Sequence, residues 1–258
     1  MKQDRQWQMK QLFLQKKRLT IKELCETFKI SVETARRDLN ALEDSGFIRR
    51  NYGGGVLIDN TNTQDLMPPW DARFTYNLPE KRAIAREMLR QIPDHSIIAL
   101  DSGTSIFELA KLLNAKNDLT ILANDLRIAV ELSSNTTHTI YFIGGAVKKD
   151  DMITTGFLTT DFLEHFSQID LALLSGDGFD VSVGVTDYNV EMGTMKKAMI
   201  KKSKQVIVGM DHSKFSINAF YKVCGIDSLT LVITDTQAPP DAIETLEKAG
   251  VKTILTGI

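Results

Sequence analysis

Two pairs of adjacent arginines lie near the start of the sequence. Arg36 and Arg37 precede Arg49 and Arg50, and the second pair leads into the glycine run 53–55. Guanidinium groups bind phosphate oxygens through paired N–H donors, and an arginine on a helix can also read guanine in the DNA major groove. The spacing therefore predicts a contact with nucleic acid, with one pair on a rigid helix and the other on a flexible tip.

Helix signals predict the elements that carry the first pair. Thr20 and Glu23 have the spacing of a capping box, which starts a helix. Ser31 is a natural cap for the next helix, whose buried face is Ala35, Leu39 and Leu42 at steps of four and three residues. With one more helix before them, three short helices whose last two are joined by a tight turn predict a helix-turn-helix.

The segment FIRRNYGGGVLI, after Gly46, alternates and turns like a two-stranded hairpin, and it predicts a wing beside the helices. In this interpretation the arginine pairs flank one groove of the duplex. The alternative is a small structural helical domain with solvated arginines. The candidate DNA contacts are Ser31, Val32, Thr34, Arg36, Arg37, Arg49, Arg50, Asn51 and Tyr52.

The charge distribution agrees with a nucleic-acid-binding head. The 258 residues have a net charge of −2, but residues 1–55 hold 12 Lys and Arg against 7 Asp and Glu, a net charge of +5. The remainder therefore has a net charge of −7. A basic segment joined to an acidic one is typical of a nucleic-acid-binding module attached to another function.

The rest of the chain divides into a join and a larger body. Residues 58–79 are polar, contain three prolines and show no sustained period, so we expect a partly extended linker. Trp70 and Phe74 are expected to anchor it. The head is then residues 1–57 and the body residues 80–258.

Apolar strands alternate with helices throughout the body. Continuous apolar strands separated by helices predict a mostly parallel sheet of about seven strands, covered on both faces. The predicted fold is a small α+β winged helix-turn-helix head followed by a larger α/β Rossmann-like domain.

Polar residues collect just after these strands, where parallel sheets bind ligands. They are Asp101, Gly103, Thr104, Ser105, Asn124, Asp125, Gly144, Gly145, Asp177, Gly178, Asp211 and Lys214. The stretch DSGTS offers a tight turn, two hydroxyls and a helix start, which suits a phosphate. Such a turn also occurs as an ordinary connection between a strand and a helix, with no role in binding. The mixture as a whole would suit a phosphorylated sugar or polyol.

The stretch RLTIKELCETFKISVETARRDLNALEDSGFIRRNYGGG resembles the N-terminal signature of the DeoR family of bacterial transcriptional regulators. It departs from that signature at Cys25, Ala35 and Tyr52, which bear on packing or base preference. The body blocks KRAIA, DSGTS, LANDLRIA, FIGG, GDGFD and MDHSKF resemble the sensor domain of the same family. The resemblance covers nearly the whole chain.

The resemblance implies a sensor domain related in fold to ribose-5-phosphate isomerase and CoA-transferases, which senses a phosphorylated sugar or related metabolite. It implies that the phosphate loop is Asp101, Gly103, Thr104 and Ser105, and that Asp211 and Lys214 form the effector signature. It also implies roles for Asn124, Thr186 and a basic position at Lys196 or Lys197. Alanine at position 123 departs from the family pattern and removes one hydroxyl.

We therefore expect a DNA-binding repressor of a carbohydrate operon, controlled by a phosphorylated sugar or polyol. The alternative is a sugar-phosphate isomerase or transferase with an accessory head, using Asp101, Asp177 or Asp211; a metal sensor is a third. We expect double-stranded operator DNA as partner, a homodimer or homotetramer, and a cytoplasmic location, since no apolar signal opens the chain. Without GxxxxGK[ST] or GxGxxG we expect no nucleotide cofactor.

Overall fold

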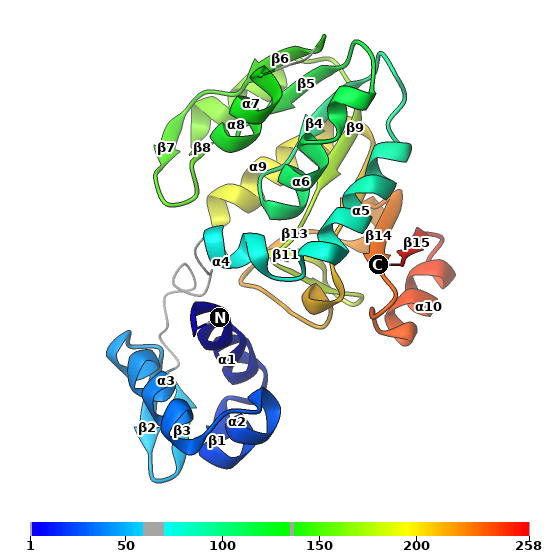
Figure 1. Cartoon of the computed structure of the whole chain (residues 1–258). Helices are drawn as coiled ribbons and strands as arrows, with labels where there is room; N and C mark the ends of the chain where they lie inside the picture. The colour runs from blue at the N-terminus through cyan, green and yellow to red at the C-terminus, as the bar shows by residue number, and fades with distance from the viewer. Residues whose placement is uncertain (1, 59–69, 135–136, 258) are drawn as a thin grey trace. The chain divides into compact units, whose positions relative to one another are not determined.

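The computed structural model describes residues 2–58, 70–134 and 137–257. The chain divides into two compact units, residues 1–76 and residues 77–258, which are described separately below (Figure 1). No helix in these described ranges is long and apolar enough to cross a membrane.

The first unit includes the head, with the predicted three helices and wing. Its elements are α1 (Lys2–Lys16), β1 (Arg18–Thr20), α2 (Ile21–Phe28), α3 (Val32–Asp44), β2 (Ile48–Asn51), β3 (Gly54–Leu57) and α4 (Trp70–Thr75). Both predicted caps form: the Thr20 hydroxyl and the Glu23 carboxylate bond reciprocally at the start of α2, and the Ser31 hydroxyl accepts from the Thr34 N–H. These caps fix where the two helices begin.

The wing is a sheet of three strands in the order β1-β3-β2, one strand more than the sequence predicted. The third strand, β1, pairs antiparallel with β3 and brings Thr20 opposite Gly54. A Cβ atom at Gly54 would overlap with the Leu19 carbonyl oxygen, so the close strand approach requires glycine. The glycine run thus lets the wing pack on the strand that precedes α2.

The predicted linker contains regular structure at its C-terminal end. Residues 59–69, including Pro68 and Pro69, lie outside the described residues. Trp70–Thr75 form α4, where Trp70 and Phe74 stack with ring centroids 6.4 Å apart. Pro79 lies in the first turn of α5, a position that proline favours because the N–H it lacks would be unbonded there. Between residue 70 and Pro79 the expected, partly extended linker therefore contains α4 and the start of α5.

The second unit, the body, is built on a seven-stranded sheet in which every neighbouring pair is parallel. In spatial order the strands are β15 (Lys252–Thr256), β14 (Leu231–Asp235), β12 (Ser203–Gly209), β9 (Ile169–Leu174), β4 (Ile97–Leu100), β5 (Thr120–Ala123) and β6 (Thr139–Phe142). The sequence-based prediction of a largely parallel sheet of about seven strands is confirmed.

Helices cover both faces of this sheet (Figure 1). One apolar core packs the sheet against α5 (Leu78–Arg90), α6 (Thr104–Ala110) and α7 (Leu126–Ser133). The other packs it against α8 (Phe157–Glu164), α9 (Val190–Lys202) and α10 (Pro240–Lys248). Successive residues of a strand point to opposite faces, so Ile98 and Leu100 enter the first core and Ala99 the second.

Two small antiparallel additions were not predicted. One is the hairpin of β7 (Ala146–Lys148) and β8 (Ile153–Thr155). The other is a three-stranded sheet of β10 (Gly178–Asp180), β11 (Gly184–Asp187) and β13 (Tyr221–Cys224). Both lie in segments that follow carboxyl ends of the main sheet, so they add side chains where ligands are expected to bind.

Candidate functional site

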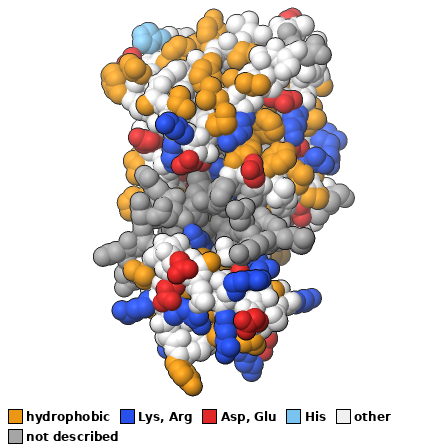
Figure 2. All heavy atoms as spheres, turned by 60° about the vertical axis from the view of Figure 1, so that its left-hand side comes forward, with side chains coloured by type: hydrophobic (Ala, Val, Ile, Leu, Met, Phe, Trp, Pro, Cys, Tyr) orange, Lys and Arg blue, Asp and Glu red, His pale blue; other side chains and the backbone are white. Residues whose placement is uncertain are grey.

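The exposed face of α3 carries the first arginine pair. Arg36 and Arg37 are both exposed, whereas Ala35, Leu39 and Leu42 are buried as predicted. Among the described residues, neither arginine takes part in an ion pair. Ser31 and Val32 are also exposed at the start of the helix, and Thr34 is half-buried. Figure 2 shows Lys and Arg side chains across the visible face of the head.

The signature aspartate that follows these arginines has a different role. Asp38 is completely buried, and its carboxylate receives Arg5 Nε of α1 at 2.6 Å and Gln6 Nε2 at 3.2 Å. Both carboxylate oxygens are therefore held by the first helix. This pair could not be predicted from the sequence, because Arg5 and Asp38 are distant in sequence and meet only through packing.

The two arginines of the wing have unequal settings. Arg49 is exposed, and no bond from its side chain is found within the described residues. Arg50 is half-buried: its guanidinium donates to Asn40 and its backbone N–H donates to Glu43 Oε1 at 2.8 Å. Tyr52 is fully exposed at the tip, next to the half-buried Asn51. Arg50 thus ties the wing to α3.

The strand order places a topological switch point in the body between β4 and β9. Along the chain the sheet grows from β4 through β5 to β6, then returns to β9 beside β4 and grows the other way. The loops at the carboxyl ends of such neighbouring strands diverge and leave a crevice, which is the usual ligand site of open α/β sheets. The stretch 101–105 follows β4, and Asp177 and Gly178 follow β9.

A buried charge cluster lies at this switch point. Lys196 of α9 places its Nζ 3.3 Å from Asp101 Oδ2 and 2.8 Å from Asp187 Oδ2. All three side chains are almost completely buried. Burial raises the pKa of Asp101, and it raises the pKa of Asp187 to about 7, although the Lys196 charge opposes both shifts. Burial alone would lower the pKa of Lys196, but the carboxylates raise it. The lysine therefore stays charged.

Two predicted residues join the cluster through the small antiparallel sheet. Asp177 Oδ2 accepts from the Tyr188 N–H at 3.1 Å, and the Asp177 N–H donates to Asp187 Oδ1 at 3.3 Å. Thr186 is the register partner of Gly178, and its hydroxyl accepts from the Ala219 N–H at 2.9 Å. Asp187 is the member that sequence reasoning missed, because its neighbours meet it only through the fold.

The DSGTS turn and the next strand end are tightly built. Gly103 adopts φ = 113°, which favours glycine, and Thr104 and Ser105 are buried at the start of α6. The Asn124 amide donates to the Thr154 carbonyl of β8 at 2.9 Å. Asp125 caps α7 through the N–H groups of Arg127 and Ile128. These bonds show that part of the predicted site also holds the fold together.

The Asp211–Lys214 pair follows β12, the other neighbour of β9. Asp211 Oδ1 accepts from Asn77 Nδ2 at 2.8 Å and from the Ser213 N–H at 3.0 Å. Burial alone would raise the pKa of Asp211, but the Lys214 charge and these hydrogen bonds lower it. The carboxylate is therefore charged at neutral pH.

His212, which the sequence did not single out, bonds Asp235 of the adjacent strand β14 through Nδ1 at 2.9 Å. The predicted glycines 144 and 145 lie farther along the edge, after β6. Gly144 accepts from the Thr159 hydroxyl at 3.0 Å. In the described parts of the body and head, no group of His, Cys, Asp or Glu side chains is arranged to hold a metal ion.

Comparison with known families identifies the protein family to which these two units belong. Residues 5–61 match the DeoR-like helix-turn-helix domain, and residues 76–236 match the DeoR C-terminal sensor domain. The chain belongs to the DeoR family. The resemblance inferred from the sequence is confirmed, and DeoR-family proteins are transcriptional regulators.

Several DeoR-family relatives are similar along nearly their full length. The transcriptional repressor AccR of Agrobacterium fabrum is 35% identical over 90% of this chain and 89% of its own. The glycerol-3-phosphate regulon repressor of Escherichia coli is 32% identical, over 88% of each chain. The repressor GlcR of Bacillus subtilis is 31% identical over 94% of this chain and 92% of its own.

Solved structures overlap with this DeoR-family chain only in part. The ribose 5-phosphate isomerase A of Methanocaldococcus jannaschii has a TM-score of 0.41 and 13% identity, over 54% of this chain and 55% of its own. A likeness of this size supports no inference about activity.

Proposed function

We propose that this DeoR-family regulator is a repressor of a carbohydrate operon whose body binds a phosphorylated sugar or polyol. The observation that carries the proposal is the pairing of two features in one chain. The first is an arginine pair exposed on the capped helix α3, and the second is a cluster of buried charges at the switch point of the body. The repressors AccR, GlcR and that of the glycerol-3-phosphate regulon support it by similarity along the chain.

For the head, we propose that α3 enters the major groove with Arg36 and Arg37, and that Arg49 binds a phosphate beside it. Ser31, Val32 and Thr34 then face base edges or backbone near the helix start, and Tyr52 and Asn51 lie at the wing tip. Arg50 is proposed to act mainly by holding the wing against Asn40. Two such heads reading two half-sites require at least a homodimer, which sedimentation of the full chain can measure.

For the body, we propose that the 101–105 turn and Lys214 bind the phosphate, while Asn124, Asp177 and Asp211 bind hydroxyls. Each of the three carboxylates that an isomerase could use for proton transfer accepts a hydrogen bond from within the protein. Asp101 accepts from the Ser175 N–H at 2.9 Å, Asp177 from the Tyr188 N–H and Asp211 from the Asn77 amide. That supports binding rather than turnover. Effector binding then shifts an equilibrium between forms of different operator affinity, by about 1–3 kcal/mol in typical allosteric proteins.

The proposal is tested first on DNA. The full chain selects from a library of random 30-bp duplexes, and the wild type is expected to enrich a sequence with twofold symmetry. The double variant Arg36→Ala/Arg37→Ala should enrich nothing, whereas the body control Lys222→Ala/Lys252→Ala should behave as wild type. Equal enrichment by the Arg36→Ala/Arg37→Ala variant would refute the assignment of α3.

The effector is tested by thermal shift with inorganic phosphate, glycerol 3-phosphate, ribose 5-phosphate and the hexose and hexitol 6-phosphates. A ligand at about 100 times its Kd stabilises the folded state by about 2.7 kcal/mol, which raises the melting temperature measurably. Absence of any shift with every compound would refute the sugar-phosphate assignment. Unchanged ribose 5-phosphate by NMR after incubation would separate binding from isomerase activity.

A further inference from the structure

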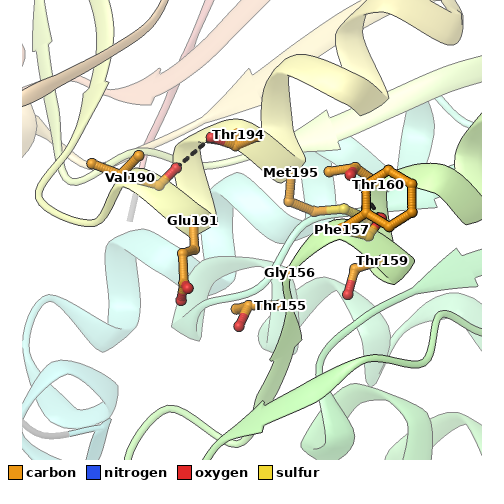
Figure 3. Close-up of a pocket in the computed structure, with 9 residues that line it drawn as sticks. All are labelled: Thr155, Gly156, Phe157, Thr159, Thr160, Val190, Glu191, Thr194 and Met195. Atoms are coloured by element: carbon orange, nitrogen blue, oxygen red, sulfur yellow. Dashed lines mark hydrogen bonds between the residues drawn. The ribbon is translucent and has the colours of Figure 1, made fainter.

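A cavity of about 240 Å³ lies between the first turns of α8 and α9 (Figure 3). Both helices lead into strands of the main sheet, α8 into β9 and α9 into β12, so both begin at the carboxyl edge of that sheet. None of the residues that line the cavity was singled out from the sequence. The volume is slightly below the roughly 300–1,000 Å³ of small-molecule sites, so the cavity suits one part of a ligand.

Residues in the walls of the cavity form hydrogen bonds with two of the predicted effector-binding segments. Thr159, which lines it, donates its hydroxyl to Gly144, and Thr155 directly follows the Thr154 that bonds Asn124 in both directions. Met195 lines it from α9, and the Nζ of the next residue, Lys196, lies 3.3 Å from Asp101 Oδ2. The cavity therefore shares α9 with the switch-point cluster, and its walls are hydrogen-bonded to the Asn124 and Gly144 segments through Thr154 and Thr159.

Its lining contains unused hydrogen-bonding groups. The Thr155 side chain belongs to a residue only 6% exposed, yet no hydrogen bond to its hydroxyl is found within the described residues. The Glu191 side chain is exposed, and its carboxylate has no side-chain partner in the described chain. In Figure 3 the Glu191 side chain extends from α9 toward Thr155. A carboxylate accepts only, and a hydroxyl both donates and accepts, so the two together fit a group that carries O–H donors.

The other lining residues add apolar surface, and the lining as a whole disfavours a negatively charged ligand group. Phe157 and Met195 lie on the side away from Glu191 (Figure 3) and offer an apolar wall to C–H groups. Among the described residues that line the cavity, only Glu191 carries a charge, and its carboxylate repels a phosphate. The carboxylate therefore disfavours the anionic end of a sugar phosphate in this cavity. The hydroxyl and the apolar side chains favour its neutral, hydroxyl-bearing carbon chain.

We propose that this cavity is the subsite for the hydroxyl-bearing end of the effector, with Glu191 and Thr155 as the residues that recognise neighbouring hydroxyls. The inference rests on the proposed sensing of a phosphorylated sugar or polyol. It assigns the choice among phosphorylated ligands to the α8–α9 cavity and leaves phosphate binding to the 101–105 turn and Lys214.

The test is isothermal titration of the full chain with the tightest-binding member of the sugar-phosphate panel and, separately, with inorganic phosphate. Glu191→Gln and Thr155→Val each keep side-chain shape and are compared with Glu244→Gln, an exposed control on α10. We expect Glu191→Gln to weaken sugar-phosphate binding at least about 10-fold, as loss of a hydrogen bond to a charged group does. Thr155→Val should weaken it about 5-fold. Affinity for inorganic phosphate should change less than about 2-fold.

The sign of the Glu191→Gln effect is decisive. If Glu191 acts only by its negative charge, removal of that charge tightens binding of every phosphorylated ligand, inorganic phosphate included. Unchanged or tighter sugar-phosphate binding by Glu191→Gln would overturn the subsite while leaving the proposed sensing intact. If the wild type binds neither inorganic phosphate nor any panel member, the proposed function fails and the subsite fails with it. Glu191 is exposed, so its variant folds even if Thr155→Val does not.

Discussion

Arg5 and Asp38 join the first and third helices of the head by an ion pair with an Nε–Oδ2 distance of 2.6 Å. Gln6 donates a hydrogen bond to the other carboxylate oxygen, so both oxygens of Asp38 are bonded to side chains of α1. The aspartate that follows the arginine pair is therefore turned away from solvent, toward the helix that supports the proposed recognition helix. It fixes the helix that carries Arg36 and Arg37.

Asp38→Asn should lower the stability of the head. The substitution leaves Arg5 without its charged partner in a largely buried setting, at a cost of about 1.5–3 kcal/mol in the free energy of unfolding. Both tryptophans of the chain, Trp7 and Trp70, belong to the first unit, so urea unfolding followed by tryptophan fluorescence measures it. Asp44→Asn, at an exposed position on the same helix, is the control. Equal midpoints for the two variants would contradict the assigned role.

Arg49→Ala and Arg50→Ala should weaken operator binding in different ways. Arg49 is exposed, so its loss removes one phosphate contact and should lower the slope of log affinity against log salt by about 0.9. The Arg50 guanidinium donates to Asn40, so its loss removes a side-chain bond between the wing and α3, while the bond from the backbone N–H to Glu43 remains. Fluorescence anisotropy with the selected duplex at several salt concentrations checks both. Lys222→Ala is the control. A wild-type slope for Arg49→Ala would show that its side chain misses the backbone.

Local signals were sufficient to predict the head and the main sheet. Thr20, Glu23 and Ser31 determine where α2 and α3 begin, because their capping bonds act within four residues. The continuous apolar runs of the strands predict a sheet that is buried on both faces. The small sheet β10-β11-β13 was missed because its strands are three or four residues long and β13 pairs across a distance in sequence. Strand β1 was missed for the same reason.

The candidate site was predictable only where it follows a strand. Asp101, Asn124, Asp177 and Asp211 stand directly after apolar runs or close behind them, so the sheet itself points to them. Asp187 and Asn77 do not, because they reach the site through the small sheet and the start of α5. Thr155, at the end of β8, and Glu191, in the first turn of α9, lie on elements that give no sequence signal of binding. Contacts of this kind are set by packing between distant segments.

Lys214→Ala should uncouple the body from its ligand. The half-buried ammonium group is the proposed phosphate partner, and its loss should raise the effector concentration for half-maximal operator release at least about 10-fold. Operator affinity without ligand should stay within about 2-fold of wild type, since Lys214 belongs to the body. An anisotropy titration of the duplex complex measures both, with Lys252→Ala as control. Release at the wild-type concentration would show that the phosphate binds elsewhere.

Asp187→Asn should change how the stability of the body depends on pH. Burial raises the pKa of Asp187 to about 7 in the folded state, while an unfolded aspartate has a pKa of about 3.9. Between these values the folded state holds a proton that the unfolded state has released, so the free energy of unfolding falls as pH rises. Asparagine does not titrate. The stability of wild type relative to the variant should therefore decrease from pH 5 to pH 8.

The measurement is urea unfolding followed by far-ultraviolet circular dichroism, since the second unit contains no tryptophan. Asp180→Asn is the matched control: hydrogen bonds from Ser182 lower the pKa of Asp180, so its titration is complete below pH 5 and its difference from wild type should be flat from pH 5 to pH 8. Parallel pH curves for wild type and Asp187→Asn would mean that Asp187 keeps its charge beside Lys196 throughout this range.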